Sequence, residues 1–204
     1  MPEPNLSNHY SEQALDPDVF LMLEFQKGDK ASFENLMRKY YKRVFNFIYR
    51  FVGSIEIAED LTQEVFMKVY KKAPSYKPQA KFQTWLYTIA KNISLNELRK
   101  HKKKMISLEE TIESDSGEIK RQFEDDTSEN PFQRLENKEL VAIIKKAINQ
   151  LPENQRIAVL LHRYEQFSYE EIAQTMGCSV SAVKSLLSRA KENLKIVLSQ
   201  NMNI

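Results

Sequence analysis

The stretch SYEEIAQTMGCSVSAVKSLLSRAKENL, Ser168–Leu194, contains two helical patterns separated by one glycine. Ser168 and Glu171 have the spacing of a capping box, in which each side chain accepts a hydrogen bond from the other residue's backbone amide. A helix is therefore expected to begin at Ser168. Gly177 follows apolar residues at helical spacing and is placed to end that helix in the left-handed conformation. Ser179 can cap a second helix directly after the turn.

The second helical pattern has one apolar face and one polar face. The apolar residues recur at intervals of three and four, as in an amphipathic helix; they are Val180, Val183, Leu187, Ala190 and Leu194. The other face carries short hydroxyls and cations, namely Ser181, Lys184, Ser185 and Ser188, with Arg189 and Lys191 at its edges. Two short helices around a three-residue turn have the geometry of a helix-turn-helix, whose second helix enters the DNA major groove. From these residues alone, an ordinary helical hairpin with a solvated face is the alternative.

Length and composition narrow the class of protein. The chain has 204 residues, of which 42% are apolar, enough for one domain or two small ones. The N-terminus lacks the order of a signal peptide, and no apolar run approaches the roughly 20 residues of a membrane span, so we expect a cytoplasmic protein without membrane insertion. The single cysteine, Cys178, excludes an internal disulfide and a cysteine-cluster zinc site. Scarce glycine and the absence of strand-like alternation predict an all-α fold.

Charge divides the chain into three parts. Residues 1–105 carry 18 Lys/Arg and 12 Asp/Glu, residues 106–136 carry 3 and 10, and residues 137–204 carry 9 and 6. The middle part is rich in Ser, Asp and Glu and poor in aromatics, a composition typical of segments that do not bury enough surface to fold. We expect an acidic linker between two small helical domains. Occupation of a nucleic-acid channel by this acidic strand is the less favoured alternative.

The N-terminal block also has helical patterns. In YYKRVFNFIYRFVGS, an apolar stripe ends at Gly53 and consists of Tyr40, Val44, Phe47, Ile48 and Phe51. In IEIAEDLTQEVFMKVYKKA, one side is marked by the apolar residues Ile57, Leu61, Val65, Phe66 and Val69. The other side carries Glu56, Asp60, Gln63 and Glu64. The acidic side is either a solvated face or a docking surface for a basic partner.

A loop with two prolines, PSYKPQAK, precedes the helical pattern FQTWLYTIAKNISLNELRKHKKK. Aromatic residues alternate here with lysines, which suits single-stranded nucleic acid because unpaired bases stack on aromatic rings while cations follow the phosphates. Trp85 fits an apolar core stripe equally well. The sequence leaves both roles open for this residue.

Two parts of the chain resemble extracytoplasmic-function sigma factors of the sigma-70 superfamily. AEDLTQEVFMKVYKKA followed by FQTWLYTIAKNISLNELRKHKKK resembles their region 2, and LPENQRIAVLLHRYEQFSYEEIAQTMGCSVSAVKSLLSRAKENL resembles their region 4. The resemblance places region 2 at 19–105 and region 4 at 137–198. We therefore expect a disordered tail at 1–18, a flexible acidic linker at 106–136 and a tail at 199–204. The resemblance implies a bacterial transcription initiation factor that binds core RNA polymerase and promoter DNA, both duplex and melted. An anti-sigma factor is an expected partner, and the free protein is expected to be a monomer.

The resemblance also assigns sites. It implies contact with the polymerase clamp through Asp60, Leu61, Gln63, Glu64 and Phe66. It implies recognition and melting of the minus-10 element by Lys77, Lys81, Trp85, Asn92, Asn96, Arg99 and Lys100. It implies reading of the minus-35 element by Ser179, Ser181, Ala182, Lys184, Ser185, Ser188 and Arg189.

The sequence departs from the family pattern in two places. Leu186 stands where many members carry an arginine, which removes an expected contact with the DNA backbone. Gln166 stands where many members have a glycine, and this change affects the turn that enters the helix-turn-helix.

Two other classes of protein fit less well. A dimeric helix-turn-helix repressor accounts for residues 168–194 but leaves the acidic face and the aromatic loop unexplained. An enzyme is the least expected class, since His9, His101 and His162 have no metal-ligand spacing and no phosphate-binding glycine loop is present. We expect no catalytic residue, metal or cofactor.

Overall fold

The computed structural model describes the backbone of residues 16–109 and 131–202, and the side chains of residues 16–100 and 140–200. Every regular element in these residues is helical, which confirms the predicted all-α fold. The elements are α1 (Pro17–Gln26), α2 (Lys30–Val52), α3 (Ile55–Lys72), the 3-10 turn η1 (Ala73–Ser75), α4 (Phe82–Glu109), α5 (Pro131–Asn149), α6 (Glu153–Arg163), α7 (Tyr169–Met176) and α8 (Val180–Met202).

The helix ends follow the local sequence signals. The capping box at the start of α7 is complete: the Glu171 amide donates to Ser168 Oγ at 3.2 Å and the Ser168 amide donates to Glu171 Oε2 at 2.8 Å. Gly177 ends α7 with a φ of 67°, and Gly53 ends α2 with a φ of 85°, both in the left-handed region that glycine adopts without strain. The Ser179 hydroxyl accepts from the Ala182 amide at 3.2 Å, as expected for the start of α8.

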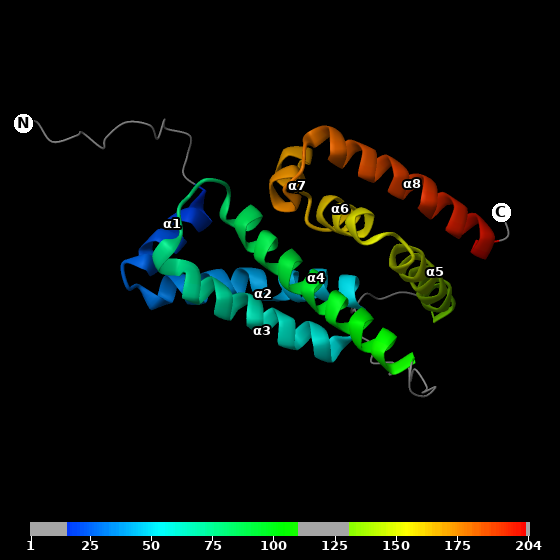
Figure 1. Cartoon of the computed structure of the whole chain (residues 1–204), viewed down its shortest axis with the longest axis horizontal. Coiled ribbons are helices and arrows are strands. Elements are labelled where there is room, and N and C mark those ends of the chain that lie inside the picture. Colours follow the sequence, from blue (N-terminus) through cyan, green and yellow to red (C-terminus); the bar gives the residue numbers. More distant parts are fainter. Residues whose placement is uncertain (1–15, 110–130, 203–204) are drawn as a thin grey trace, which may run out of the picture.

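Helices α1 to α4 form one packed block (Figure 1). The predicted apolar stripe of α2 lies in its core, where Val44 and Ile48 are fully buried. The start of α4 supplies the facing side chains, among them Phe82, Leu86 and Tyr87, which are also fully buried. Complete burial of such large side chains stabilises a fold by about 1.5–3 kcal/mol each relative to leaving them exposed.

Helices α5 to α8 form the second block, which lies against the first (Figure 1). Helix α6 contacts α2, and α7 contacts α4. The ring of Phe167, 3% exposed, stands edge-on to Tyr87 at 5.2 Å between centroids. The apolar core therefore runs without a break from one block into the other.

The ends of α4 and α5 can be compared with the expected bounds of the acidic linker. Helix α4 continues to Glu109 and α5 begins at Pro131, so both ends of the range 106–136 are helical, and residues 110–130 lie outside the described residues. Residues 1–15 and 203–204 also lie outside them, whereas α1 begins at Pro17 and α8 reaches Met202.

Candidate nucleic-acid interface

Helix α8 has a polar outer face, and its opposite, apolar face packs into the core and so fixes which residues point outward. Val183 and Ala190 are fully buried, which fixes the rotation of the helix about its axis. Ala182 is half-buried, and the remaining residues that the sequence assigned to this surface are exposed; they are Ser179, Ser181, Lys184, Ser185, Ser188 and Arg189. We call these six exposed residues the α8 stripe. Short hydroxyls beside two cations can reach base edges and phosphates in a groove.

Leu186 is half-buried and packs against the apolar core. A leucine at this position therefore contributes to packing of α8, whereas an arginine would direct its guanidinium away from the core. Leu186 thus replaces a possible contact with the DNA backbone by a packing contact with the core.

A hollow of about 560 Å³ lies beside the loop that joins η1 to α4. The indole of Trp85 and the ring of Tyr76 stand 4.8 Å apart between centroids and form one wall. Trp85 is half-buried, so it both packs on Phe82 and faces the hollow. The other residues that line the hollow are Lys72, Ser75, Lys77, Gln79, Ala80, Thr84, Thr88 and Gln174. Aromatic rings among lysines suit an unpaired base and its phosphate.

The Tyr76 hydroxyl is buried and has no hydrogen-bond partner among the described residues. Burial, together with the charge of Asp16, raises the pKa of Tyr76 to about 12. The phenol therefore keeps its proton at neutral pH and can donate a hydrogen bond.

The cations assigned to the minus-10 element differ in their surroundings. Lys77 and Arg99 are exposed, as are Asn92 and Asn96 along α4. Lys100 pairs with Glu97 at 3.3 Å. Lys81 forms an ion pair of 2.7 Å with Glu171 of α7, and the hydrogen bond and charge of Glu171 raise the pKa of Lys81.

Helix α3 presents an acidic face opposite its buried side. Asp60, Gln63 and Glu64 are exposed, and Glu64 lies 3.6 Å from Lys68. Leu61 and Phe66, which the resemblance also assigned to polymerase contact, are only 5% and 4% exposed and lie in the core. Their side chains therefore hold α3 in place, and the surface available to a partner consists of the polar residues together with exposed apolar side chains, among them Met67 at 58%.

A buried carboxylate joins the two blocks. Glu165, in the loop between α6 and α7, is 5% exposed and accepts from Arg43 Nε of α2 at 3.2 Å and from the Tyr87 hydroxyl of α4. Burial and the charge of Glu165 both raise the pKa of Tyr87. The sequence did not indicate this contact, since a single glutamate in a loop carries no local signal of burial.

The contact between the two blocks, which we call the joint, includes two cations that each donate to a backbone carbonyl of the other block. Arg156 of α6 donates to the Phe51 carbonyl at 3.0 Å and to the Leu151 carbonyl at 3.2 Å, and burial lowers the pKa of its guanidinium. Lys91 of α4 donates to the Thr175 carbonyl at 2.8 Å, and burial lowers the pKa of its ammonium. The last carbonyls of a helix carry partial negative charge, so a cation is stabilised beside them.

Of the three histidines, only His162 lies among the described side chains. It is exposed at the end of α6, with Nδ1 3.2 Å from the Phe167 carbonyl. In the described part of the chain, no group of three or more His, Cys, Asp or Glu is placed to hold a metal. No helix there combines the length and apolar content that crossing a bilayer requires.

Comparison with known proteins matches both blocks. The model of sigma-70 region 2 matches residues 36–104, and that of sigma-70 region 4 matches residues 142–194. The RNA polymerase sigma-H factor of Pseudomonas aeruginosa is 35% identical over 181 residues, which are 87% of this chain and 91% of the relative. The ECF RNA polymerase sigma-E factor of Escherichia coli is 34% identical over 176 residues, or 86% of this chain and 91% of the relative.

Two solved structures have a similar arrangement of helices. The sigma factor RpoE of Bartonella quintana, in complex with the anti-sigma factor NepR, has a TM-score of 0.63 and 26% identity over 82% of this chain and 96% of that one. CnrH in complex with the cytosolic domain of CnrY has a TM-score of 0.65 and 19% identity, over 91% of this chain and 99% of that one, and has the same fold as this chain. Both regions, in this order and over nearly the whole length of curated relatives, place the chain among the extracytoplasmic-function sigma factors of the sigma-70 family, which bind core RNA polymerase and direct transcription initiation at specific promoters.

Proposed function

We propose that this sigma factor divides promoter recognition between the α8 stripe, which reads the minus-35 element, and the hollow beside Trp85, which captures unpaired bases of the minus-10 element. The observation that carries the proposal is the α8 stripe itself. Its early residues Ser181, Lys184 and Ser185 are exposed, while Val183 between them is fully buried. Recognition helices contact base edges through such early turns.

Within the stripe, position suggests different roles for the two cations. Lys184 lies in the second turn of α8, where a side chain reaches base edges. Arg189 lies five residues further, about 7.5 Å along the helix axis, and meets the phosphate backbone. We assign base readout to Lys184, with Ser181 and Ser185, and a backbone clamp to Arg189.

The minus-10 assignment rests on stacking and charge. Extruding a base costs a few kcal/mol, and stacking on an aromatic ring returns about 1–3 kcal/mol per base. Trp85 supplies such a ring, with Tyr76 packed against it, and Lys72 and Lys77 supply cations for the phosphates. Asn92, Asn96 and Arg99 continue the polar surface along α4, with Lys100 at its end.

Core polymerase docks, in this proposal, on the exposed polar residues of α3: Asp60, Gln63 and Glu64. The protein acts by binding alone, without a chemical step of its own, and works in the cytoplasm, where promoter DNA lies. An anti-sigma factor controls it by covering the joined blocks. This part of the proposal is supported by the Bartonella quintana sigma factor, whose solved structure is a complex with the anti-sigma factor NepR.

The test compares Lys184→Ala with Arg189→Ala in reconstituted holoenzyme on a library of minus-35 sequences at two salt concentrations. Lys184→Ala is expected to lose about 1–3 kcal/mol at one or two base pairs only. Arg189→Ala is expected to weaken binding to all sequences alike and to lower the salt slope by about one. Lys195→Ala, an exposed lysine on the same helix beyond the stripe, is the matched control.

Two results contradict the proposal. A uniform loss with Lys184→Ala makes Lys184 a backbone clamp and moves base readout to Ser181, Ala182 and Ser185. Tight, specific binding of the free chain to duplex promoter, without core polymerase, would instead favour a helix-turn-helix repressor.

A further inference from the structure

Helix α1 holds both ends of the loop that forms the hollow. The loop leaves α3 through η1, Ala73–Ser75, and enters α4 at Phe82. Gln26 at the last position of α1 meets the loop where it begins, and Asp16 at the N-cap of α1 meets it where it ends. We refer to residues 73–82 as the capture loop.

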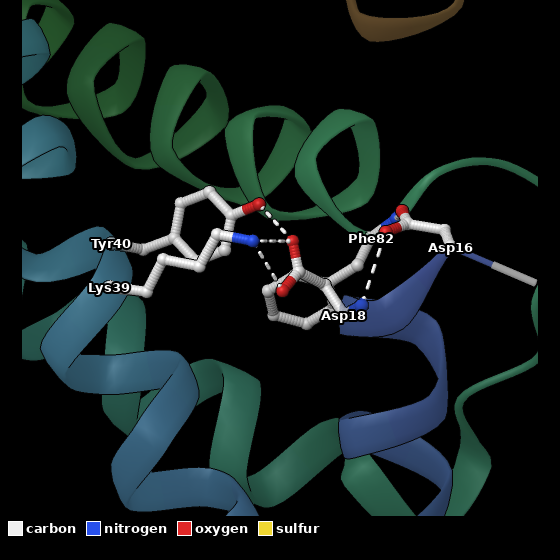
Figure 2. Close-up of polar contacts among 5 residues, drawn as sticks. All are labelled: Asp16, Asp18, Lys39, Tyr40 and Phe82. Carbon is white, nitrogen blue, oxygen red and sulfur yellow. Dashed lines mark hydrogen bonds and ion pairs between the residues drawn. The ribbon is translucent and has the colours of Figure 1, made fainter.

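Asp16 caps two helices with one carboxylate. Oδ1 accepts from the Asp18 amide in the first turn of α1, and Oδ2 accepts from the Phe82 amide at the start of α4, both at 3.1 Å (Figure 2). Unsatisfied amides at a helix start are costly, and a side-chain oxygen usually satisfies them from the same helix. Here the N-terminus of α4 depends on a residue 66 positions earlier.

Gln26 uses both hydrogens of its amide on the other end of the capture loop. Nε2 donates to the Ala73 carbonyl at 2.6 Å and to the Tyr76 carbonyl at 2.9 Å. Inside the loop, the described backbone bonds are short-range: from the Tyr76 amide to the Ala73 carbonyl and from the Gln79 amide to the Lys77 carbonyl. Long-range support for the loop backbone therefore comes from α1.

Helix α1 is itself fixed to the block by a buried carboxylate. Asp18, 4% exposed, accepts from Lys39 Nζ at 2.6 and 2.7 Å and from the Tyr40 hydroxyl at 2.5 Å (Figure 2). Met22 and Phe25 bury the same side of α1 in the core. With its first turn and its apolar face both fixed, α1 spans about 15 Å as a rigid strut between its two contacts with the loop.

We propose that α1 is a splint that sets the shape of the capture loop before DNA arrives, with Asp16 and Gln26 as its positioning residues. The inference rests on the proposed capture of unpaired bases beside Trp85. A loop that already has its final shape binds an unpaired base without the entropy cost of becoming ordered. Its affinity for a base that emerges as the strands open is therefore higher than that of a flexible loop. Asp16 and Gln26 do not line the hollow, and they act through the backbone of the loop.

The test uses isosteric variants in reconstituted holoenzyme. Asp16→Asn keeps one acceptor oxygen, so it caps one helix and presents an amide to the other. Gln26→Glu places a carboxylate against two carbonyls. Each variant is expected to slow permanganate-detected opening of a duplex promoter roughly fivefold to tenfold, the effect of one lost cap. Each is expected to weaken binding of a single-stranded minus-10 oligonucleotide by a similar factor.

Asp29→Ala is the matched control for stability. Asp29 caps α2 through the Ala31 amide at 3.0 Å and the Ser32 hydroxyl at 2.6 Å, within the same block but away from the capture loop. It should cost fold stability without slowing opening. Lys27→Ala, next to Gln26 and exposed, should change neither. Core binding and minus-35 duplex binding should stay within about twofold for Asp16→Asn and Gln26→Glu.

Two outcomes would overturn the proposal that α1 sets the shape of the capture loop. The first is opening at the wild-type rate by folded Asp16→Asn and Gln26→Glu. The second is an equal loss in every assay, core binding included, which would show that the two variants reduce the amount of folded protein rather than the shape of the loop. If wild-type holoenzyme opens promoters but binds the minus-10 oligonucleotide no better than Trp85→Ala does, the proposed capture site fails instead.

Discussion

The turn after Glu165 holds a residue in a conformation that side chains resist. Gln166 has a φ of 59° and is the one non-glycine residue with positive φ in the described part of the chain. The turn directs Glu165 inward to Arg43 and Tyr87, while Gln166 itself stays exposed. A glycine at this position would adopt the same turn without strain, since glycine has no Cβ to clash.

Gln166→Gly is therefore expected to raise the free energy of unfolding by about 0.5–1 kcal/mol, because relief of left-handed strain exceeds the extra entropy of the unfolded chain. Gln166→Val is expected to lower it by a larger amount, because β-branched residues fit this region worst. Urea unfolding measures both. Gln63→Gly, at an exposed glutamine within α3, replaces the same residue type in ordinary helical backbone and should lose stability. Equal effects of glycine at 63 and 166 would contradict the argument from strain.

At the scale of single helices, α3 shows how one element serves the core and the surface. Val65 and Val69 are fully buried, whereas Asp60 and Glu64, one turn apart, face solvent. The docking role proposed for this face rests on its exposed residues, the carboxylates of Asp60 and Glu64 among them, since Leu61 and Phe66 are taken up by the core. It therefore responds to charge reversal without loss of the fold.

Asp60→Lys with Glu64→Lys is expected to abolish binding to core polymerase while changing the free energy of unfolding by no more than about 1 kcal/mol. The small cost comes from removing the pair of Glu64 with Lys68 and from placing two lysines four residues apart. Fluorescence anisotropy with labelled core measures the binding. Glu34→Lys with Glu192→Lys makes the same change in net charge at exposed sites on α2 and α8. Wild-type affinity in the α3 double variant would place the docking face elsewhere.

Local signals in the sequence predicted the elements well and their assembly poorly. The caps at Ser168 and Ser179 and the glycine at 177 could be predicted because each depends on residues within four positions. The support of the Phe82 amide by Asp16 and the burial of Glu165 could not, since both depend on residues more than 60 positions away. The apolar spacing in α3 already marked Leu61 and Phe66 as core, and the family resemblance outweighed it.

At the scale of the whole molecule, the proposed sites for the minus-35 and minus-10 elements lie too close together to bind both elements of one promoter. Lys81 beside the hollow and Glu171 of the helix-turn-helix are in direct contact at 2.7 Å, and Gln174 of α7 lines the hollow itself. Elements centred about 25 base pairs apart lie roughly 85 Å from each other along duplex DNA. The joint must therefore open before α8 and the hollow can engage one promoter together.

Opening has to break the contacts of Glu165, because its buried carboxylate bonds to Arg43 and Tyr87 of the other block. Its partner Arg43 is 40% exposed, so solvent screens part of the attraction, and we expect Glu165 to favour the closed arrangement by about 1–3 kcal/mol. Glu165→Ala should then shift the free protein toward open forms by roughly tenfold to a hundredfold. Glu165→Gln, which can still accept from the Tyr87 hydroxyl but carries no charge, should lie between Glu165→Ala and wild type.

Energy transfer between dyes at Lys42→Cys and Lys195→Cys, exposed positions on α2 and α8, reports opening when Cys178 is replaced by serine. Transfer should fall in Glu165→Ala, and the affinity for core polymerase should rise, since separating the blocks then costs less free energy. Glu170→Gln, an exposed glutamate on α7, should leave both unchanged. Unchanged transfer in Glu165→Ala would mean that the remaining contacts between the blocks hold them together without the buried carboxylate, and Phe167→Ala would then test the apolar contact of Phe167 with Tyr87.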